Sequence, residues 1–566
     1  MAKQRRIVVI GGSAAGPKAA AKARRMDQHA DVTIIQKDAE LSMASCGYPY
    51  YVGGVFHDRN ELLATPAGVV RDPKFYLNAK GIQAITNTEA MAIDRAAHTV
   101  TCTNLLSGEV QVVPYDKLVV ATGANAVMPP IPGVALEGVT AMQRMRDADY
   151  LRKLADEKKA KRALVVGGGL IGIETYEALH LAGMEITGVE MLPQLLAFLD
   201  WDMAKLVENH VRSKGVRVIL NDAVTEFIGR DGHVVGARLR SGGEVECDVA
   251  VVAIGVRPNV TLARDAGLAI GDRGGIAVNE YMQTSDPDIY AVGDCIEVPH
   301  LITGDRVLAP YGDLANLEGR VAGQNAVAGN TVTFPGTIMT GVCKVFDFVA
   351  GATGLSGEKS KKAGFTKAMS VVVPGPDKPH FMGGKPLVLK LVGDPDSGRI
   401  LGLQCVGTGD VSKRIAAAAM AILGKLTLAD VANADLPYAP PFSPALDNLI
   451  TAAHCLENKM LGRFKGISCV EVKAKLDAGD DMLLLDCRSP EEYDEVRLGV
   501  GECLMPLGAL RKRLNELPED KGTEIICYCM ISLRGYEAAG VLEANGYTNV
   551  KVMEGGISAW PFPREK

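Results

Sequence analysis

The segment RRIVVIGGSAAGPKAAAKARR, residues 5–25, decides the fold because it joins three features in a fixed order. A β-branched run comes first, a glycine-rich turn follows, and a stretch with a helical pattern ends it. A buried parallel strand that leads into a helix has this pattern. The segment KRALVVGGGLIGIETYEALHLAG, residues 161–183, repeats the design. A second strand follows each one, DVTIIQKD at 31–38 and EITGVEML at 185–192, so we predict two βαβ units in one chain.

Length and composition limit the remaining possibilities. A chain of 566 residues predicts several domains. The net charge of −6 does not indicate a nucleic-acid partner, and no uncharged apolar run approaches the 20 or so residues that span a bilayer. Twelve cysteines without framework spacing are typical of reduced thiols in a cytoplasmic protein. We therefore expect a cytoplasmic protein with no membrane partner, no nucleic-acid partner and no metal site.

The two glycine-rich turns predict dinucleotide binding. Glycine lets the backbone approach a pyrophosphate closely, and the helix N-terminus supplies N–H groups and a favourable dipole. One such turn alone could be structural, but two turns with second strands at the expected offset indicate two dinucleotide sites. The candidate residues are Gly11, Gly12, Ser13, Ala14, Ala15 and Gly16 in the first turn, and Gly167, Gly169 and Gly172 in the second.

The residues that end the second strands predict which nucleotide binds. Glu190 lies about 20 residues beyond the second turn, where an acid hydrogen-bonds a ribose 2′-hydroxyl. Because a carboxylate repels a 2′-phosphate, we predict NADH rather than NADPH. Gln36, followed by Lys37, has the comparable place in the first unit. Gln36 is either a ribose ligand without charge or an ordinary strand-end residue.

Up to about residue 457 the chain resembles the flavoprotein disulfide reductases that have two dinucleotide-binding domains. The resemblance rests on VVIGGSAAG, LVVATGANAVMPPIPG, LVVGGGLIGIE, AIGVRPN and IYAVGDC. It implies that the first unit holds FAD and the second the nicotinamide nucleotide. It also implies that Asp294 bonds the ribityl chain of the flavin. Further cofactor contacts are implied at Ala121, Thr122, Gly123, Gly255 and Lys37.

The stretch LSMASCGYPYYVGG, residues 41–54, holds one cysteine, Cys46, and the next cysteine is Cys102. A lone cysteine cannot close an internal disulfide, so it is oxidised to a mixed disulfide, a persulfide or a sulfenic acid. A buried inert thiol is the alternative. The stretch resembles the single-cysteine branch of the family, which comprises coenzyme A disulfide reductases, NADH-dependent persulfide and polysulfide reductases, and NADH oxidases and peroxidases.

Further residues favour the coenzyme A members of that branch. YAPPF at 438–442 resembles a family segment whose first tyrosine reaches the partner subunit's cysteine, which implies a homodimer in which Tyr438 is a general acid. Lys18, Lys22 and Arg25 share one side of the first helix and are candidates for the coenzyme A phosphates, unless they are only a solvated face. Ser42 and Lys74 also match family substrate positions.

The sequence departs from the family at two positions of this region. Phe381 stands where members often have a second tyrosine, and Leu446 stands where they have a lysine. The first departure weakens a two-tyrosine mechanism. The second loosens coenzyme A binding or shifts the preference toward other persulfides.

The last hundred residues resemble rhodanese. LLLDCRSPEEYDE and the loop CMISLR carry the resemblance, and the loop keeps Cys529 and Arg534 at C-x₄-R spacing. Loop N–H groups aimed at a cysteine sulfur stabilise a thiolate that carries sulfane sulfur. Ser532 replaces the usual loop glycine, and LGVGEC replaces the usual GHIPGA. An inactive scaffold domain is therefore the alternative.

These observations predict an α/β fold with four domains. They are a Rossmann-like FAD-binding domain, a Rossmann-like NAD-binding domain, an α+β dimerisation domain and a C-terminal rhodanese-like α/β domain. The predicted limits are 1–150 with 265–330, 151–264, 331–457 and 467–566, with a linker at 458–466.

The predicted function is NADH-dependent reduction of persulfides or polysulfides, with coenzyme A persulfide as the first choice and coenzyme A disulfide as a further substrate. Cys46 is the redox cysteine, hydrogen sulfide is the product, and Cys529 carries sulfane sulfur. One alternative is an NADH oxidase or peroxidase that cycles Cys46 through sulfenic acid. Another is a sulfur-binding redox sensor without catalysis.

Overall fold

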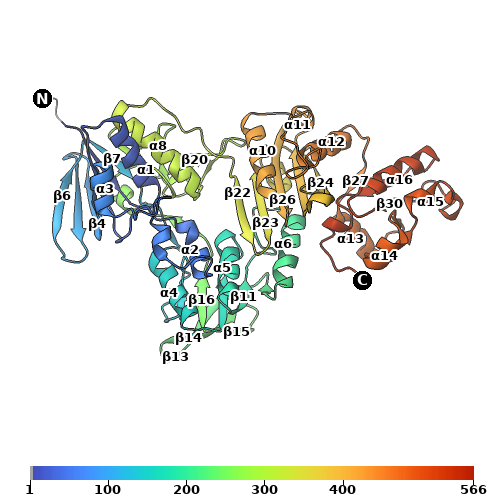
Figure 1. Ribbon diagram of the computed structural model, residues 1–566, viewed down its shortest axis with the longest axis horizontal. Coiled ribbons are helices and arrows are strands. Elements are labelled where there is room, and N and C mark those ends of the chain that lie inside the picture. Colours follow the sequence, from blue (N-terminus) through green and yellow to red (C-terminus); the bar gives the residue numbers. More distant parts are fainter. Residues whose placement is uncertain (1–3) are drawn as a thin grey trace. The chain divides into compact units, whose positions relative to one another are not determined.

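The computed structural model describes residues 4–566, which fall into two compact units (Figure 1). The first unit comprises residues 4–191 and 221–337, and the second comprises 192–220 and 338–566. Each unit is described by itself.

The first unit contains a parallel sheet whose central strand, β1, leads into the first glycine-rich turn. Its core is β1, which pairs with β2 on one side and β7 on the other. These strands are almost wholly buried, which agrees with their β-branched composition. The strand order is β19 (Ile289–Ala291), β7 (Lys117–Val120), β1 (Arg6–Ile10), β2 (Asp31–Ile35) and β3 (Gln83–Ile85).

Two helices pack closely beside this sheet, α1 (Ala15–Met26) and α8 (Gly312–Ala328). Two glycines of α8 allow the close approach. A Cβ on Gly319 would overlap the carbonyl oxygen of Ala15, and one on Gly323 would overlap that of Ala19. The α1–α8 contact therefore fixes the N-terminal end of α8 near the first glycine-rich turn.

A second parallel sheet in the same unit repeats the arrangement. Within the unit its strands lie in the order β11 (Glu185–Val189), β10 (Arg162–Val166), β16 (Val249–Val252) and β9 (Val139–Thr140). Helix α5 (Leu170–Leu181) follows β10 directly. The two strand–turn–helix units predicted from the sequence are confirmed.

Further helices of the first unit are α2 (Tyr48–Val52), α3 (Pro73–Lys80), α4 (Met145–Asp156) and α7 (Thr261–Asp265). Two of its small sheets are β4 (Thr88–Asp94), β5 (Thr99–Asn104) and β6 (Val110–Pro114), and β13 (Val224–Arg230), β14 (His233–Leu239) and β15 (Glu244–Glu246). Two more are β8 (Ala124–Ala126) with β17 (Val256–Pro258), and β18 (Ile276–Ala277), β20 (Ile296–Pro299) and β21 (Arg306–Val307).

The second unit contains one antiparallel and one parallel sheet. The antiparallel order is β22 (Gly341–Val345), β23 (Phe348–Gly354), β26 (Ile400–Gly407), β25 (Pro386–Gly393) and β24 (Met369–Pro376). The helices of this part are α6 (Trp201–Ser213), α9 (Gly357–Lys362), α10 (Val411–Leu423), α11 (Leu428–Ala432) and α12 (Asn448–Met460). Helix α10 packs against β23 and β26, and α12 packs against β24 and β25.

The parallel sheet belongs to the C-terminal part of the chain, drawn in red in Figure 1. Its order is β27 (Gly466–Ile467), β31 (Val550–Met553), β30 (Ile525–Tyr528), β28 (Leu483–Asp486) and β29 (Cys503–Leu504). The helices are α13 (Cys469–Ala478), α14 (Pro490–Glu495), α15 (Leu507–Leu510) and α16 (Leu533–Ala544). The fully buried Trp560 lies in the core of this part.

A buried ion pair docks the C-terminal part onto the antiparallel sheet. Glu554, just after β31, pairs with Lys459 of α12 and accepts a hydrogen bond from the Val372 amide at 3.2 Å. Glu554 is almost wholly buried, and its pKa is raised by desolvation in spite of Lys459. Loss of either partner would leave the other charge buried without compensation. The pair therefore specifies how this part sits on α12 and β24.

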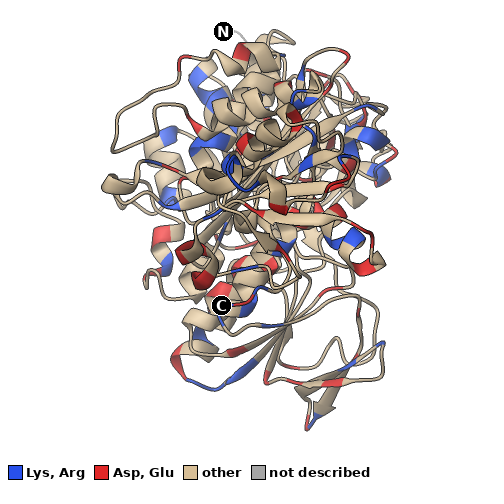
Figure 2. Ribbon diagram, turned by 90° about the vertical axis from the view of Figure 1, so that its right-hand side faces the viewer, with Lys and Arg blue, Asp and Glu red and all other residues tan. Residues whose placement is uncertain are grey.

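Acidic and basic residues are interspersed along the ribbon in view in Figure 2. Among the described residues, no helix is long and apolar enough to cross a bilayer.

Candidate active sites

The first glycine-rich turn has no room for side chains. Gly11 has φ +110°, and a Cβ there would overlap the carbonyl oxygen of Ala121. A Cβ on Gly16 would overlap the carbonyl oxygen of Gly11. Helix α1 then begins without a side-chain hydrogen bond from its N-cap, Ala14. Its first N–H groups and its dipole therefore suit an anionic group such as a pyrophosphate.

The second turn is built in the same way. Gly167 has φ +114°, and a Cβ there would overlap the carbonyl oxygen of Ala253. A Cβ on Gly172 would overlap the carbonyl oxygen of Gly167. Gly169 is the N-cap of α5 and has no side chain with which to cap it. The chain thus presents two equivalent turns whose geometry suits a phosphate group.

The strand-end residues hold the two turns in shape. The Gly12 amide donates to Gln36 Oε1 at 2.8 Å, and the Gly168 amide donates to Glu190 Oε2 at 2.6 Å. Gln36 and Glu190 therefore occupy equivalent places, as predicted from their spacing. The predicted contacts of both with a ribose hydroxyl remain predictions.

Some of the other proposed cofactor residues follow strands of the two parallel sheets, and the rest lie at or near the first turn. Ala121, Thr122 and Gly123 follow β7 beside the first turn, and the Thr122 hydroxyl donates to the Asn259 carbonyl at 2.7 Å. Gly255 follows β16 with φ +108°. Lys37 instead forms an ion pair with Glu89 at 2.7 Å, and Ser13 is exposed on the first turn.

Asp294 lies beyond β19, in the segment that packs on the start of α1. The neighbouring Gly293 amide donates to Glu318 Oε2 at 2.7 Å, and a Cβ on Gly293 would lie 3.1 Å from the Ala15 Cβ. Desolvation raises the pKa of Asp294 and brings that of Glu318 to about 7. Asp294 is therefore held close to the first turn, near a nucleotide bound there.

Cys46 is tied to the first turn through the residues just before it. The Ser42 amide donates to the Gly12 carbonyl at 2.7 Å, and a Cβ on Gly12 would lie 2.7 Å from Leu41 Cδ2. Cys46 then lies in a short 3₁₀ helix, Ser45–Gly47, directly before α2. Of the twelve cysteines, all of which lie among the described residues, Cys46 is the one that is exposed.

The Cys46 thiol lies at the N-terminal end of α8. A Cβ on Gly312, the first residue of α8, would be 3.7 Å from Cys46 Sγ. The positive end of a helix dipole stabilises a thiolate. Opposing this, partial burial raises the pKa of the thiol, and the charges of Glu174, Asp294 and Asp313 raise it further.

Glu174 is a site residue that the sequence prediction missed. It lies on α5, it acts on the Cys46 thiol, and desolvation raises its own pKa to about 7. A carboxyl group with such a pKa changes charge near neutral pH, so the electrostatic environment of Cys46 changes there as well. The sequence signal was present, because Glu174 ends the GGGLIGIE motif.

The proposed phosphate ligands on α1 belong to a larger basic cluster. Desolvation lowers the pKa of Lys22, and the charges of Arg320 and Arg25 lower it further. Lys18 is exposed on α1, where a Cβ on Gly319 of α8 would lie 3.2 Å from its Cβ. Arg320, on α8, was not predicted, because nothing in the sequence pairs α8 with α1.

Ser42 and Lys74 lie on segments that meet in the first unit. Ser42 has φ 52°, and its side chain bonds the buried Tyr76 of α3. Lys74 is exposed near the start of the same helix. The two residues are thus connected through α3.

Tyr438 belongs to the second unit and is 55% exposed. Other exposed large apolar residues of this unit include Phe442, Leu446 and Phe381. The last two are the positions at which the sequence departs from its family.

Cys529 follows β30 and is almost wholly buried. Arg534 forms two hydrogen bonds of 2.6 Å to Glu492, and both Glu492 and the Cys529 thiol raise its pKa. Ser532 keeps the loop conformation in which glycine is usual, with φ 80°, and its hydroxyl donates to the Met553 carbonyl at 2.9 Å. The serine therefore does not prevent the loop from forming.

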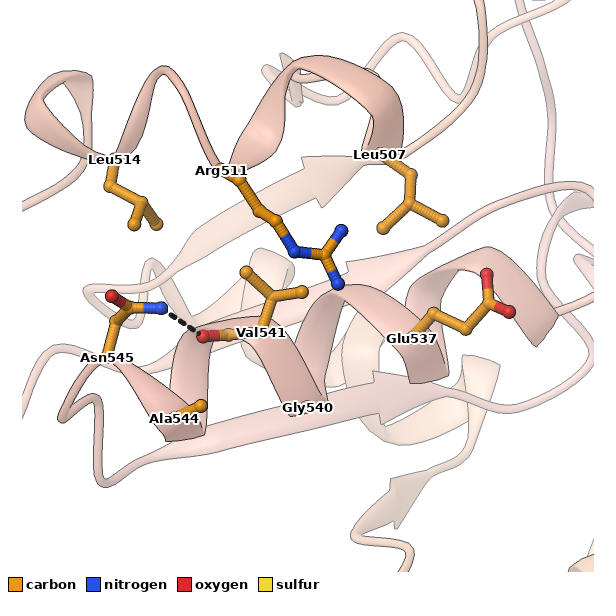
Figure 3. Close-up of a pocket in the computed structure, with 8 residues that line it drawn as sticks. All are labelled: Leu507, Arg511, Leu514, Glu537, Gly540, Val541, Ala544 and Asn545. Atoms are coloured by element: carbon orange, nitrogen blue, oxygen red, sulfur yellow. Dashed lines mark hydrogen bonds between the residues drawn. The ribbon is translucent and has the colours of Figure 1, made fainter.

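A separate hollow lies between α16 and the segment that contains Leu507, Arg511 and Leu514 (Figure 3). Leu507, Leu514 and Val541 give it apolar walls, Arg511 extends into its middle, and Glu537 lies toward the end near Leu507. None of the site residues predicted from the sequence lines it.

Three family comparisons cover most of the chain. Residues 5–306 match the family described as pyridine nucleotide-disulphide oxidoreductase, residues 340–450 match its dimerisation domain, and residues 468–561 match the rhodanese-like domain.

The chain belongs to the pyridine nucleotide-disulphide oxidoreductase family. It is an FAD- and NAD(P)H-dependent oxidoreductase with a C-terminal rhodanese-like domain, and the predicted fold class is confirmed. The predicted domain limits and the roles of single residues remain predictions.

Three relatives of this oxidoreductase show what similar chains do. A NAD-dependent persulfide reductase from A. fulgidus is 42% identical with a TM-score of 0.93, over 98% of this chain and 100% of that one. An NADH oxidase from Methanocaldococcus jannaschii is 34% identical over 79% of this chain and 98% of that protein. An NAD(P)H coenzyme A polysulfide/persulfide reductase from Pyrococcus horikoshii is 34% identical over 80% of this chain and 99% of that protein.

The position of Glu174 predicts a pH effect on Cys46. Above pH 7 Glu174 is ionised, and its charge opposes formation of the Cys46 thiolate. Glu174→Gln should therefore lower the pKa of Cys46 and speed its alkylation near neutral pH. The measurement is the rate of iodoacetamide labelling of Cys46 against pH in the NADH-reduced holoenzyme. The exposed Glu185 provides the control, Glu185→Gln, and identical profiles for all three proteins would contradict the prediction.

Proposed function

We propose that this protein uses NADH to reduce the sulfur–sulfur bond of persulfides and polysulfides, with coenzyme A persulfide as its principal substrate and coenzyme A disulfide as another. The observation that carries the proposal is the single exposed thiol. Cys46 lies beside the N-terminal end of α8, four residues after Ser42, which is bonded to the first dinucleotide turn. The other cysteines of that unit, Cys102, Cys247 and Cys295, are buried. The names of the A. fulgidus and P. horikoshii relatives support this choice of substrate.

The chemistry at Cys46 has two stages. The Cys46 thiolate attacks the sulfane sulfur of coenzyme A persulfide, so a Cys46 persulfide forms and coenzyme A leaves as its thiolate. Two electrons and two protons then cleave the Cys46 persulfide to a thiol and hydrogen sulfide. When bound, FAD passes electrons from NAD(P)H to sulfur, and the first turn, Gln36 and Asp294 would hold it.

The remaining residues bind and orient the substrates. The N-terminal end of α8 favours the thiolate form of Cys46. The Glu174 carboxylate, when ionised, raises the pKa of Cys46 and so opposes that form. Lys18, Lys22, Arg25 and Arg320 bind the coenzyme A phosphates, and Ser42 and Lys74 are further contacts of the same substrate in this proposal. Glu190 accepts a hydrogen bond from a ribose 2′-hydroxyl and repels a 2′-phosphate, so NADH is favoured over NADPH.

The C-terminal domain supplies sulfane sulfur. Cys529 is in contact with Arg534, and the loop between them keeps its left-handed turn at Ser532. Cys529 therefore carries sulfane sulfur as a persulfide in this proposal.

An NADH oxidase activity is the second candidate, because the Methanocaldococcus jannaschii relative and others carry that name. In that activity Cys46 would cycle through a sulfenic acid. The rhodanese-like domain favours the persulfide reaction, because oxygen or peroxide turnover needs no sulfur carrier.

Replacement of Cys46 tests the proposal. Cys46→Ser should still bind FAD and let NADH bleach it, because these steps need no thiol. Persulfide-dependent NADH oxidation should fall by about 10³-fold or more, as expected on removal of a nucleophile. Cys102→Ser, a change at a buried thiol of the same unit, should leave activity near normal. Substantial persulfide turnover by Cys46→Ser would refute the proposed role.

We also propose a homodimer with shared sites, which the match to the dimerisation domain and the exposed Tyr438 support. We propose that Tyr438 protonates the thiolate that leaves at the partner subunit's site, so Tyr438→Phe should slow turnover by about 10²–10⁴-fold. Mixing Tyr438→Phe subunits with Cys46→Ser subunits should restore partial activity, because each heterodimer has one intact site. Heterodimers that form yet recover no activity would contradict shared sites.

A further inference from the structure

The Cys529 loop lies beside a fixed pair of opposite charges. Arg534 makes two hydrogen bonds of 2.6 Å to the carboxylate of Glu492. Glu492 is itself held by the start of α14, where its amide bonds the Ser489 hydroxyl and its carboxylate bonds the Ser489 amide. The pKa of Glu492 is lowered to about 2, chiefly by Arg534, so the carboxylate is ionised throughout the working pH range.

A second pair next to it adds no net charge. Arg488 donates to the Glu492 carbonyl at 2.8 Å, and its guanidinium bonds Asp486 at 2.8–3.1 Å. Arg488 and Asp486 are both completely buried. The two arginines and the two carboxylates of this cluster therefore cancel in charge.

The loop and the first turn of α16 are apolar on their exposed side. Ile531, Leu533 and Tyr536 are 39%, 59% and 37% exposed. Arg534 is the one charged residue in the segment CMISLR, residues 529–534. The exposed surface of the loop and of the first turn of α16 therefore offers aliphatic and aromatic side chains, and the charge of Arg534 is already offset by Glu492.

We infer that Cys529 takes sulfane sulfur from an organic persulfide with an uncharged tail, not from a sulfur oxyanion such as thiosulfate, and that Glu492 sets this preference by neutralising Arg534. The inference rests on the proposed sulfur-carrying role of Cys529. Thiosulfate brings two negative charges toward a thiolate and needs a cation to offset them. An organic persulfide needs only contact with its tail, which the exposed apolar residues supply.

The transfer is a thiol–persulfide exchange without net oxidation. The Cys529 thiolate attacks the outer sulfur of R–S–SH, and a new sulfur–sulfur bond forms on Cys529. The sulfur–sulfur bond of the donor breaks, and R–S⁻ leaves with its electron pair. Glu492 acts here as a positioning residue, because it reaches the donor only through Arg534.

The test compares two sulfur donors in the full-length holoenzyme without NADH. Pantetheine persulfide or thiosulfate is the donor, cyanide is the acceptor, and thiocyanate is measured. The wild-type kcat/KM should be at least about 100-fold higher for pantetheine persulfide. Glu492→Gln should raise kcat/KM for thiosulfate about tenfold or more, chiefly through KM, because a charge of Arg534 is released. This gain should shrink as salt is added.

Two matched variants separate charge from structure. Glu491→Gln changes the neighbouring exposed carboxylate of α14 and should alter neither donor. Glu492→Asp keeps the carboxylate charge, so kcat/KM for thiosulfate should stay low. Equal use of both donors by the wild type, no transfer from either, or parallel changes for both donors in Glu492→Gln would each overturn the inference.

The outcome is independent of the reductase test. NADH oxidation with coenzyme A persulfide depends on Cys46 and is measured separately, whereas thiocyanate formation without NADH depends on Cys529. A failure at Cys46 with the donor preference intact would remove the proposed reductase function alone. The reverse result would remove the present inference alone.

Discussion

The first unit depends on two places where one stretch of backbone crosses another with no space for a side chain. Gly11 lies against the Ala121 carbonyl, and Gly167 lies against that of Ala253. The first crossing brings the end of β1 next to β7, and the second brings the end of β10 next to β16. Each leaves the N-terminus of the helix after the turn open to an anion. A methyl group at either glycine would force the strands apart. The cofactor sites and the placement of Cys46 follow from this constraint, since Ser42 is bonded to the first of these turns.

The second unit depends on a different kind of contact. The Glu554–Lys459 pair is buried and joins the rhodanese-like domain to α12, and Asn209 of α6 donates to the Pro561 carbonyl at 2.9 Å nearby. Trp201 and Phe562 add an aromatic contact with ring centroids 5.7 Å apart. Polar contacts of this type fix one arrangement because a shifted interface would leave the buried charges unpaired. The rhodanese-like domain is thus docked on its neighbour by specific contacts.

The sequence predicted those features that depend on local pattern. The glycines, the strands on both sides of them and the strand-end residues Gln36 and Glu190 follow from spacing alone, and the structure shows the two residues in equivalent hydrogen bonds. The loop at Ser532 was in doubt because serine rarely adopts a left-handed conformation. A hydrogen bond from the Ser532 hydroxyl to the Met553 carbonyl accompanies the left-handed turn, and that partner lies 21 residues away, so no local pattern could reveal it.

Features that depend on packing between distant segments were not predicted. Glu174 affects Cys46 only because α5 and the Cys46 segment meet, and Arg320 joins Lys22 only because glycines let α8 approach α1. The bond from Arg534 to Glu492 links positions 42 residues apart. The sequence shows the motifs that contain them, CMISLR and LLLDCRSPEEYDE, but does not show that they are in contact. In each case the residue type was known, but its partner was set by tertiary structure.

The central claim is that the exposed Cys46 thiol serves sulfane sulfur, not oxygen or peroxide. The most direct measurement is the anaerobic rate of NADH oxidation with coenzyme A persulfide, coenzyme A disulfide, polysulfide and hydrogen peroxide under identical conditions. The account predicts the highest kcat/KM for coenzyme A persulfide, with one hydrogen sulfide released for each NADH consumed. Faster turnover with peroxide than with any sulfur substrate, or persulfide turnover without hydrogen sulfide, would contradict it.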